Sequence, residues 1–294
     1  MKRTENSFWA RFTTEIDESE LRDPGVLTVL KIIWYTVRGF FTERPGQIIF
    51  TTFILIMLWG THGKMELLGE MWPAWRGPGS DPATRPSLIP GVPWDHELIS
   101  FAGGFILLVV IPALVIRLGF NRPLSAYGLG LPPPGRRSLA VLTFVLLTLI
   151  SLPAFWLGAG IPEMRATYPL YRGLSGDLGE FVLYELSYLP FFIVIEFIFR
   201  GYLLFGLAHV MDRDVQNGDE GHPGPFYFHK YAVLIQMLSY TAWHLGKPLP
   251  ELWGTLVWGL AAGATAYAIR SVWPIILSHW LLNVVMDALI VYGP

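Results

Sequence analysis

The sequence predicts an all-α fold: a polytopic transmembrane helix bundle of seven or eight spans, with an amphipathic helix near the N-terminus. Hydrophobic residues make up 52% of the chain, charged residues only 15%, and the mean hydropathy is +0.44. A soluble domain carries about 25% charged residues. The chain also has 12 Trp, 19 Phe and 12 Tyr, and such aromatic side chains typically anchor helices at both membrane interfaces.

Seven segments have the length and composition of a membrane crossing, or come close to it. A transmembrane helix needs about 20 mostly apolar residues to cross the hydrocarbon core. The seven segments are Gln47 to Gly63, Leu98 to Leu118, Ser138 to Leu157, Phe181 to Ala208, Tyr231 to Leu245, Leu252 to Ile269 and Val272 to Tyr292. The first and the fifth fit the pattern least well.

The N-terminal segment differs from the rest of the chain. Met1 to Asp23 is polar and charged, so we expect no cleavable signal peptide there. Val26 to Phe41 mixes apolar residues with Lys31 and Arg38, a pattern typical of a helix lying on the membrane surface. An eighth, tilted span is the alternative for this segment. We therefore divide the chain into an interfacial segment (1–45), N-terminal transmembrane helices (46–178) and a C-terminal core domain (179–294).

The distribution of Lys and Arg predicts the orientation, because positive charges are retained on the cytoplasmic side. Positive residues gather before the first span and after the second. They are Lys2, Arg3, Arg11, Arg22, Lys31, Arg38 and Arg44, followed by Arg122, Arg136 and Arg137. We expect a multi-pass integral membrane protein of the bacterial cytoplasmic membrane, with its N-terminus in the cytoplasm.

Composition also excludes several classes of function. The chain has no cysteine, which excludes a nucleophilic thiol and a thiolate metal site. Its net charge is only −2 and no run of like charges occurs, so we expect no nucleic-acid partner.

Glu196 and Arg200 form the first polar group within a predicted span. An ionisable side chain in the bilayer costs about 2.5–3.5 kcal/mol and usually marks function. Their spacing places both residues on one helix face, in the favourable order for a pair. The spacing allows either a buried ion pair or a polar cavity in which Glu196 acts as a base.

His244 and Tyr240 form the second group, at the end of the fifth span. A lone histidine at a helix end is more often an interfacial or capping residue than a base. The third group lies in the last span, where His279, Asn283 and Asp287 recur at four-residue steps. These polar residues could form hydrogen bonds between helices or point into a shared site.

The three groups together resemble the CAAX-protease and bacteriocin-processing (CPBP) family. A Glu-x-x-x-Arg helix, an aromatic-x-x-x-His helix and a His-x-x-x-Asn helix follow one another between Glu180 and Asp287. The family includes the type II CAAX prenyl endopeptidases, which cleave the last three residues from prenylated proteins within the membrane. Other members are linked to bacteriocin immunity and abortive infection.

The resemblance implies an intramembrane endopeptidase and assigns roles to the matching residues. Glu196 would activate water with help from His244, while His279 and Asn283 would stabilise the oxyanion. Arg200, Tyr240 and Asp287 would support them. The mechanism needs no cofactor, and the expected partners are membrane lipids and a hydrophobic or prenylated peptide.

One departure from the family pattern favours a second hypothesis. The family motif usually begins with two adjacent glutamates, and the position of the first is Ile195 here. Adjacent helix positions point about 100° apart, so Glu196 cannot simply replace the missing carboxylate. The alternative to an enzyme is therefore a catalytically silent relative that binds a lipidated partner or stabilises a membrane-protein complex.

Two further points remain open in the sequence. Two histidines and a glutamate can hold zinc, but no His-Glu-x-x-His motif occurs, so zinc is not favoured. Counting along the predicted spans puts Glu196 and His279 in the cytoplasmic half of the bilayer and His244 nearer the outer side. A broken or re-entrant helix after His244 would reconcile these depths.

Overall fold

The computed structural model describes residues 21–22, 25–60, 81, 86–208 and 226–293. Within these ranges the chain forms helices joined by turns, with no β-strand. The chain divides into two compact units, Met1–Phe50 and Thr51–Pro294. All the predicted site residues belong to the second unit.

The first unit contains α3 (Val26–Thr42) and the beginning of α4 (Arg44–Leu58). Helix α3 covers the segment predicted to form an amphipathic helix. Its location on a membrane surface stays a prediction, as does the division of the chain into three regions.

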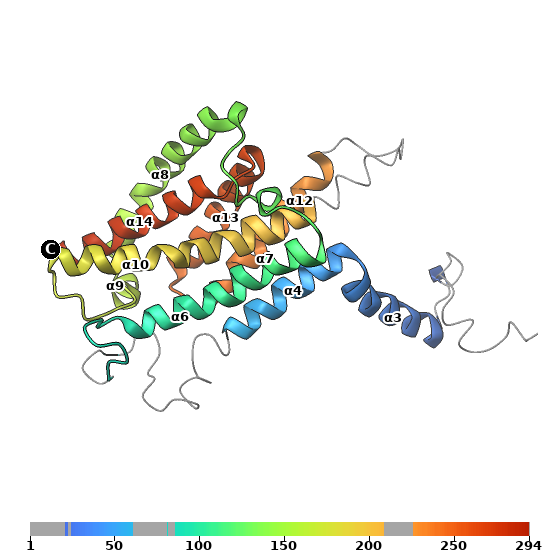
Figure 1. The fold of residues 1–294 in the computed structure, drawn as a ribbon, viewed down its shortest axis with the longest axis horizontal. Helices are drawn as coiled ribbons and strands as arrows, with labels where there is room; N and C mark the ends of the chain where they lie inside the picture. Colours follow the sequence, from blue (N-terminus) through green and yellow to red (C-terminus); the bar gives the residue numbers. More distant parts are fainter. Residues whose placement is uncertain (1–20, 23–24, 61–80, 82–85, 209–225, 294) are drawn as a thin grey trace, which may run out of the picture. The chain divides into compact units, whose positions relative to one another are not determined.

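The second unit is built from long helices and short helical turns (Figure 1). Its N-terminal part comprises α6 (Asp95–Phe105), η3 (Ile106–Val110), α7 (Ile111–Leu114), η4 (Val115–Gly119), η5 (Leu124–Tyr127), η6 (Pro134–Arg136), α8 (Arg137–Ala159) and α9 (Pro162–Thr167). Its C-terminal part comprises α10 (Leu178–Glu196), η7 (Phe197–Leu203), α12 (Phe226–Trp243), α13 (Leu249–Ile269) and α14 (Trp273–Tyr292).

Five helical stretches of the described chain are long and apolar enough to cross a membrane. They are Asp95–Gly119, Pro134–Ala159, Leu178–Ala208, Leu249–Ile269 and Trp273–Tyr292. Helix α4, in the place of the first predicted span, is apolar but shorter. Helix α12 overlaps the fifth. The chain thus has the helices of an integral membrane protein, while the count of seven or eight spans stays a prediction.

The helix that begins at Leu178 is the central element of the second unit. In the most apolar 18-residue stretch of this helix, 94% of the residues are buried, compared with 6% in the corresponding stretch of the helix Pro134–Ala159. In Figure 1, α10 lies alongside α6 and α14, which it contacts, while α8 packs on the other side of α14. Side chains on α10 therefore face protein, and those on α8 are largely left for lipid.

Small residues allow α12 and α13 to approach closely. A Cβ atom added to Gly259 would lie 3.0 Å from Met237 Cγ, and one added to Gly263 would overlap the Gln236 amide. Gln236 Nε2 donates to the carbonyl oxygens of Gly259, at 2.6 Å, and Val233, at 3.0 Å. Such small-residue contacts with interhelical hydrogen bonds are typical of packing in membranes.

The loop before α8 holds the start of α14 in place. Gly128 has a positive φ of 80°, a conformation that favours glycine. The Gly128 carbonyl accepts from Val272 N at 2.9 Å, and Trp273 Nε1 donates to the Leu129 carbonyl at 3.0 Å. These contacts fix the first turn of the helix that carries His279 and Asn283.

Candidate active site

Glu196 lies at the end of α10, where the helix changes to a π-helical turn. Arg200 lies inside that turn, and such turns occur frequently at functional sites. Arg200 Nη1 is 3.2 Å from Glu196 Oε2, and both side chains are fully buried. The contact is an ion pair without hydrogen-bond alignment. The Arg200 guanidinium also lies 3.9 Å from the ring centre of Tyr240, so α10 and α12 share this cation.

The second oxygen of Glu196 contacts two further helices. His279 Nδ1 lies 2.6 Å from Glu196 Oε1, and Trp258 Nε1 donates to the same oxygen at 3.4 Å. An ionised carboxylate can only accept hydrogen bonds, so Nδ1 of His279 carries the proton in this contact. Glu196 thereby fixes the ring of His279 and leaves its Nε2 atom for the pocket.

His244 follows the last residue of α12 in a hydrogen-bonded turn. Its Nδ1 atom lies 2.8 Å from the carbonyl oxygen of Tyr240. A carbonyl only accepts, so Nδ1 is the donor and Nε2 of the neutral ring has a free lone pair. The turn has hydrogen bonds from His244 N to Thr241 O and from Lys247 N to His244 O. Helix α13 begins at Leu249, so a short turn separates it from α12 after His244.

Asn283 and Asp287 lie on α14, one and two turns beyond His279. Asn283 Nδ2 donates to Asp287 Oδ2 at 3.0 Å, and Asp287 is fully buried. The Asp287 carboxyl group also interacts with that of Glu185 on α10. Asp287 therefore orients the Asn283 amide, whose second N–H remains available.

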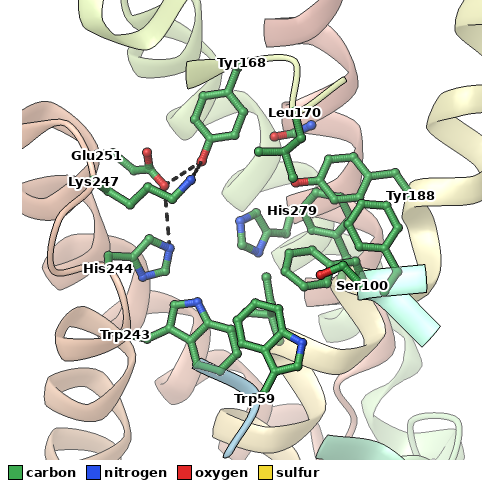
Figure 2. A pocket seen from close by; sticks show the side chains of 15 residues that line it. Trp59, Ser100, Tyr168, Leu170, Tyr188, Trp243, His244, Lys247, Glu251 and His279 are labelled. Carbon is green, nitrogen blue, oxygen red and sulfur yellow. Dashed lines mark hydrogen bonds and ion pairs between the residues drawn. The ribbon is translucent and has the colours of Figure 1, made fainter. Parts of the chain in front are cut away.

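His244, His279 and Asn283 all line one cavity of about 310 Å³. Figure 2 shows the two imidazole rings facing each other across it. Glu196 does not line the cavity but contacts His279, which does. The structure thus brings together three of the four predicted catalytic residues at the cavity wall and places the fourth directly behind them.

The cavity wall is aromatic away from the histidines. Trp59 and Trp243 stack with ring centres 4.5 Å apart, and Phe101 and Phe191 lie 4.9 Å apart. All four rings line the cavity. Ile195, the residue at the position of the missing glutamate, lines it too. The cavity therefore has a polar side, which carries the histidines, and an apolar side formed by these rings and Ile195.

Sequence reasoning missed a polar cluster at one end of the cavity: Tyr168, Lys247 and Glu251 (Figure 2). Tyr168 donates its hydroxyl hydrogen to Glu251 Oε1 at 2.7 Å, and Lys247 Nζ donates to the Tyr168 hydroxyl at 3.1 Å. Glu251 Oε1 lies 3.7 Å from His244 Nε2. A sign of this cluster in the sequence is the carboxylate of Glu251, seven positions after His244 and directly before the predicted sixth span.

Tyr168 keeps its proton in this cluster. Burial raises the pKa of its hydroxyl well above the usual value, and the nearby Glu251 carboxylate raises the pKa further. Tyr168 is therefore a fixed hydrogen-bond donor to Glu251 at neutral pH.

Glu196, His244 and His279 do not group as metal ligands. Among the described residues, no cluster of three His, Cys, Asp or Glu side chains has the arrangement to hold a metal ion. The Nδ1 atoms of both histidines are already engaged, by Glu196 and by the Tyr240 carbonyl.

Comparison with protein families gives one match. Residues 179–285 match the family described as Type II CAAX prenyl endopeptidase Rce1-like. The matched segment contains α10, α12, α13 and most of α14, and agrees with the resemblance to the CPBP family. Comparison with curated proteins and with solved structures gives no match.

Proposed function

We propose, from the premise that residues 179–285 form a type II CAAX prenyl endopeptidase-like domain, that this protein hydrolyses peptide bonds of membrane-associated proteins. The observation that carries the proposal is the convergence of His244, His279 and Asn283 on one cavity. The substrates we expect are hydrophobic or prenylated peptides. The aromatic wall formed by residues such as Trp59 and Trp243 supports this choice.

His244 is the group that receives the proton of the attacking water. Its Nε2 lone pair faces the cavity because Nδ1 is bound to the Tyr240 carbonyl. The water oxygen attacks the carbonyl carbon of the scissile bond as its proton passes to His244 Nε2. When the C–N bond breaks, the same proton passes to the leaving amine, so His244 returns to its starting state.

His279 and Asn283 stabilise the negative oxygen that forms during the attack. The electron pair of the C=O double bond moves onto that oxygen, which then needs hydrogen-bond donors. His279 Nε2, when protonated, and the second Asn283 N–H are such donors. Glu196, ion-paired with Arg200, holds the ring of His279 in place through its 2.6 Å contact with Nδ1. In this proposal Glu196 acts through His279 and is a positioning residue.

Ile195 favours an alternative of a different class. An isoleucine side chain lines the cavity at the position where the family motif has a carboxylate. A protein that lacks this base and has no replacement for it would bind lipidated partners, or stabilise a membrane complex, without cleaving anything. The aromatic wall suits such binding equally well.

The test is hydrolysis of farnesylated and unprenylated peptides by the purified protein in detergent. We expect the native protein to cleave the farnesylated peptide faster. His244→Ala should lower kcat by about 10²–10⁴-fold, and Asn283→Ala by about 10²–10³-fold. Glu163→Gln is the matched control, because Glu163 is exposed and outside the cavity. Its kcat should equal that of the native protein.

The outcomes separate the two functions. Cleavage that survives both His244→Ala and Asn283→Ala would remove the site as proposed. Saturable binding of the farnesylated peptide, without cleavage by the native protein, would favour the silent binder.

A further inference from the structure

Glu251 is a partly buried carboxylate at the cavity, and within the described part of the chain its second oxygen has no hydrogen-bond partner. Its side chain is 14% exposed, and among the described residues no group donates a hydrogen bond to Oε2, which is itself buried. A buried acceptor without a donor is unfavourable, so an unpaired oxygen at a cavity calls for an explanation such as a bound water or a catalytic role. The residue lies in the first turn of α13.

The first oxygen of Glu251 faces His244. Oε1 accepts from the Tyr168 hydroxyl at 2.7 Å and lies 3.7 Å from His244 Nε2. This separation is too long for a direct hydrogen bond. The neutral ring presents a lone pair at Nε2, so the two facing atoms are both acceptors. A water molecule has two O–H donors and can bridge two such acceptors from the side of the cavity.

From this geometry we infer that Glu251 is a catalytic residue that holds and activates the attacking water together with His244. The inference rests on the proposed hydrolase function. One O–H of the water donates to Glu251 and the other to His244, which orients an oxygen lone pair towards the cavity. His244 takes the proton as the C–O bond forms, and the Glu251 carboxylate stabilises the imidazolium that results.

Glu251 and Glu196 differ in their position relative to the reacting atoms, and therefore in the roles that they can have. Glu196 is behind His279, ion-paired with Arg200 through one oxygen and bound by His279 and Trp258 through the other. Glu251 lines the cavity itself and stands next to the histidine that must gain a proton. The carboxylate that Ile195 cannot provide is therefore supplied from α13.

Tyr168 and Lys247 position this carboxylate. Tyr168 binds Oε1, and the Lys247 ammonium contacts the Tyr168 hydroxyl at 3.1 Å and lies 4.7 Å from the centre of its ring. The cluster joins the segment after α9 to the start of α13, so the carboxylate is held from two sides. Such fixed groups are needed to orient a water for attack.

The experiment compares Glu251→Gln with the native protein on the farnesylated peptide. Glutamine keeps the size and an acceptor for Tyr168 but removes the negative charge. We expect kcat to fall at least 100-fold while KM changes less than about three-fold, since general-base assistance contributes about 10²–10⁴-fold. Glu251→Asp retains a carboxylate and should recover at least ten-fold in kcat over Glu251→Gln. Glu163→Gln removes the same charge from an exposed position and should leave kcat unchanged.

Three results have distinct meanings. If the native protein is active, His244→Ala is inactive and Glu251→Gln keeps more than one third of native kcat, the inference is wrong and the proposed function stands. An inactive Glu251→Gln whose activity is not improved in Glu251→Asp would also contradict it, provided both variants unfold at the native temperature. Absence of turnover by the native protein would contradict the proposed function, and this inference with it.

Discussion

The buried ion pair between Glu196 and Arg200 gives the sharpest stability prediction. The perturbation is Arg200→Met, which removes the cation and keeps most of the side-chain volume. Glu196 is fully buried, so the substitution leaves a carboxylate whose remaining partners are His279 and Trp258. Breaking one side of a buried pair destabilises a protein by about 3–5 kcal/mol. The loss of the contact between Arg200 and Tyr240 acts in the same direction.

The double variant Glu196→Gln/Arg200→Met provides the comparison. It removes both charges, while glutamine can still accept hydrogen bonds from His279 and Trp258. Removing both members of a buried pair is often close to neutral. We therefore expect the double variant to be more stable than Arg200→Met alone.

Thermal unfolding of the purified proteins in detergent measures both effects. At about 2–4 °C per kcal/mol, Arg200→Met should lower the unfolding midpoint by about 6–20 °C. The double variant should recover at least half of that loss. A drop of less than 2 °C in Arg200→Met, or no recovery in the double variant, would show that the two charges do not depend on each other.

Three other predictions concern packing and the cavity cluster. Gly263→Ala should destabilise the protein by about 1–3 kcal/mol, because its Cβ would displace the Gln236 amide. Gly254→Ala should not destabilise the protein, because the space around its added Cβ is open. Equal unfolding midpoints for the two glycine variants would contradict the α12–α13 contact. Gly128→Ala should cost more than about 1–2 kcal/mol, because of its positive φ and because the added Cβ would lie 2.6 Å from Phe205 Cε2, and the same measurement checks it. Because the pKa of Tyr168 is raised, its contribution to stability is complete below about pH 10 and is lost as the pH rises further. Tyr168→Phe should therefore lose less stability than the native protein between pH 9 and 11.5, and an identical loss would refute the assignment.

Much of the site could be predicted because its residues contrast with their surroundings. His279, Asn283 and Glu196 are polar groups within apolar helices, where polar side chains are unfavourable without a function. Their spacing along α10 and α14 follows the helical repeat, so the sequence also indicates which of them share a face. The contact between Glu196 and His279 could not be derived, because it depends on how two helices 83 positions apart pack.

Glu251 could not be recognised by the same contrast. In the sequence it falls between two predicted spans, next to Pro250, where charged residues are common. Its role depends on the 3.7 Å distance between its Oε1 atom and His244 Nε2, and on the hydrogen bond from Tyr168, which is 83 positions away in sequence. Both contacts are set by tertiary packing, for which the sequence has no local pattern.

The depth conflict at His244 has a physical origin. Depth counted along a span assumes that the helix begins at a membrane surface, but the helix that begins at Leu178 continues for 31 residues. At about 1.5 Å per residue this is longer than the bilayer is thick. Residue counts from a helix end therefore do not measure depth, and His244 and His279 reach the same cavity.

A structure of the protein with a peptide phosphinate bound, which mimics the tetrahedral intermediate, is the most direct measurement. We expect one phosphinate oxygen within about 2.6–3.2 Å of both His279 Nε2 and Asn283 Nδ2, and the other within the same distance of His244 Nε2. A phosphinate bound outside the cavity, or inside it but out of reach of all three side chains, would contradict the proposed hydrolytic site.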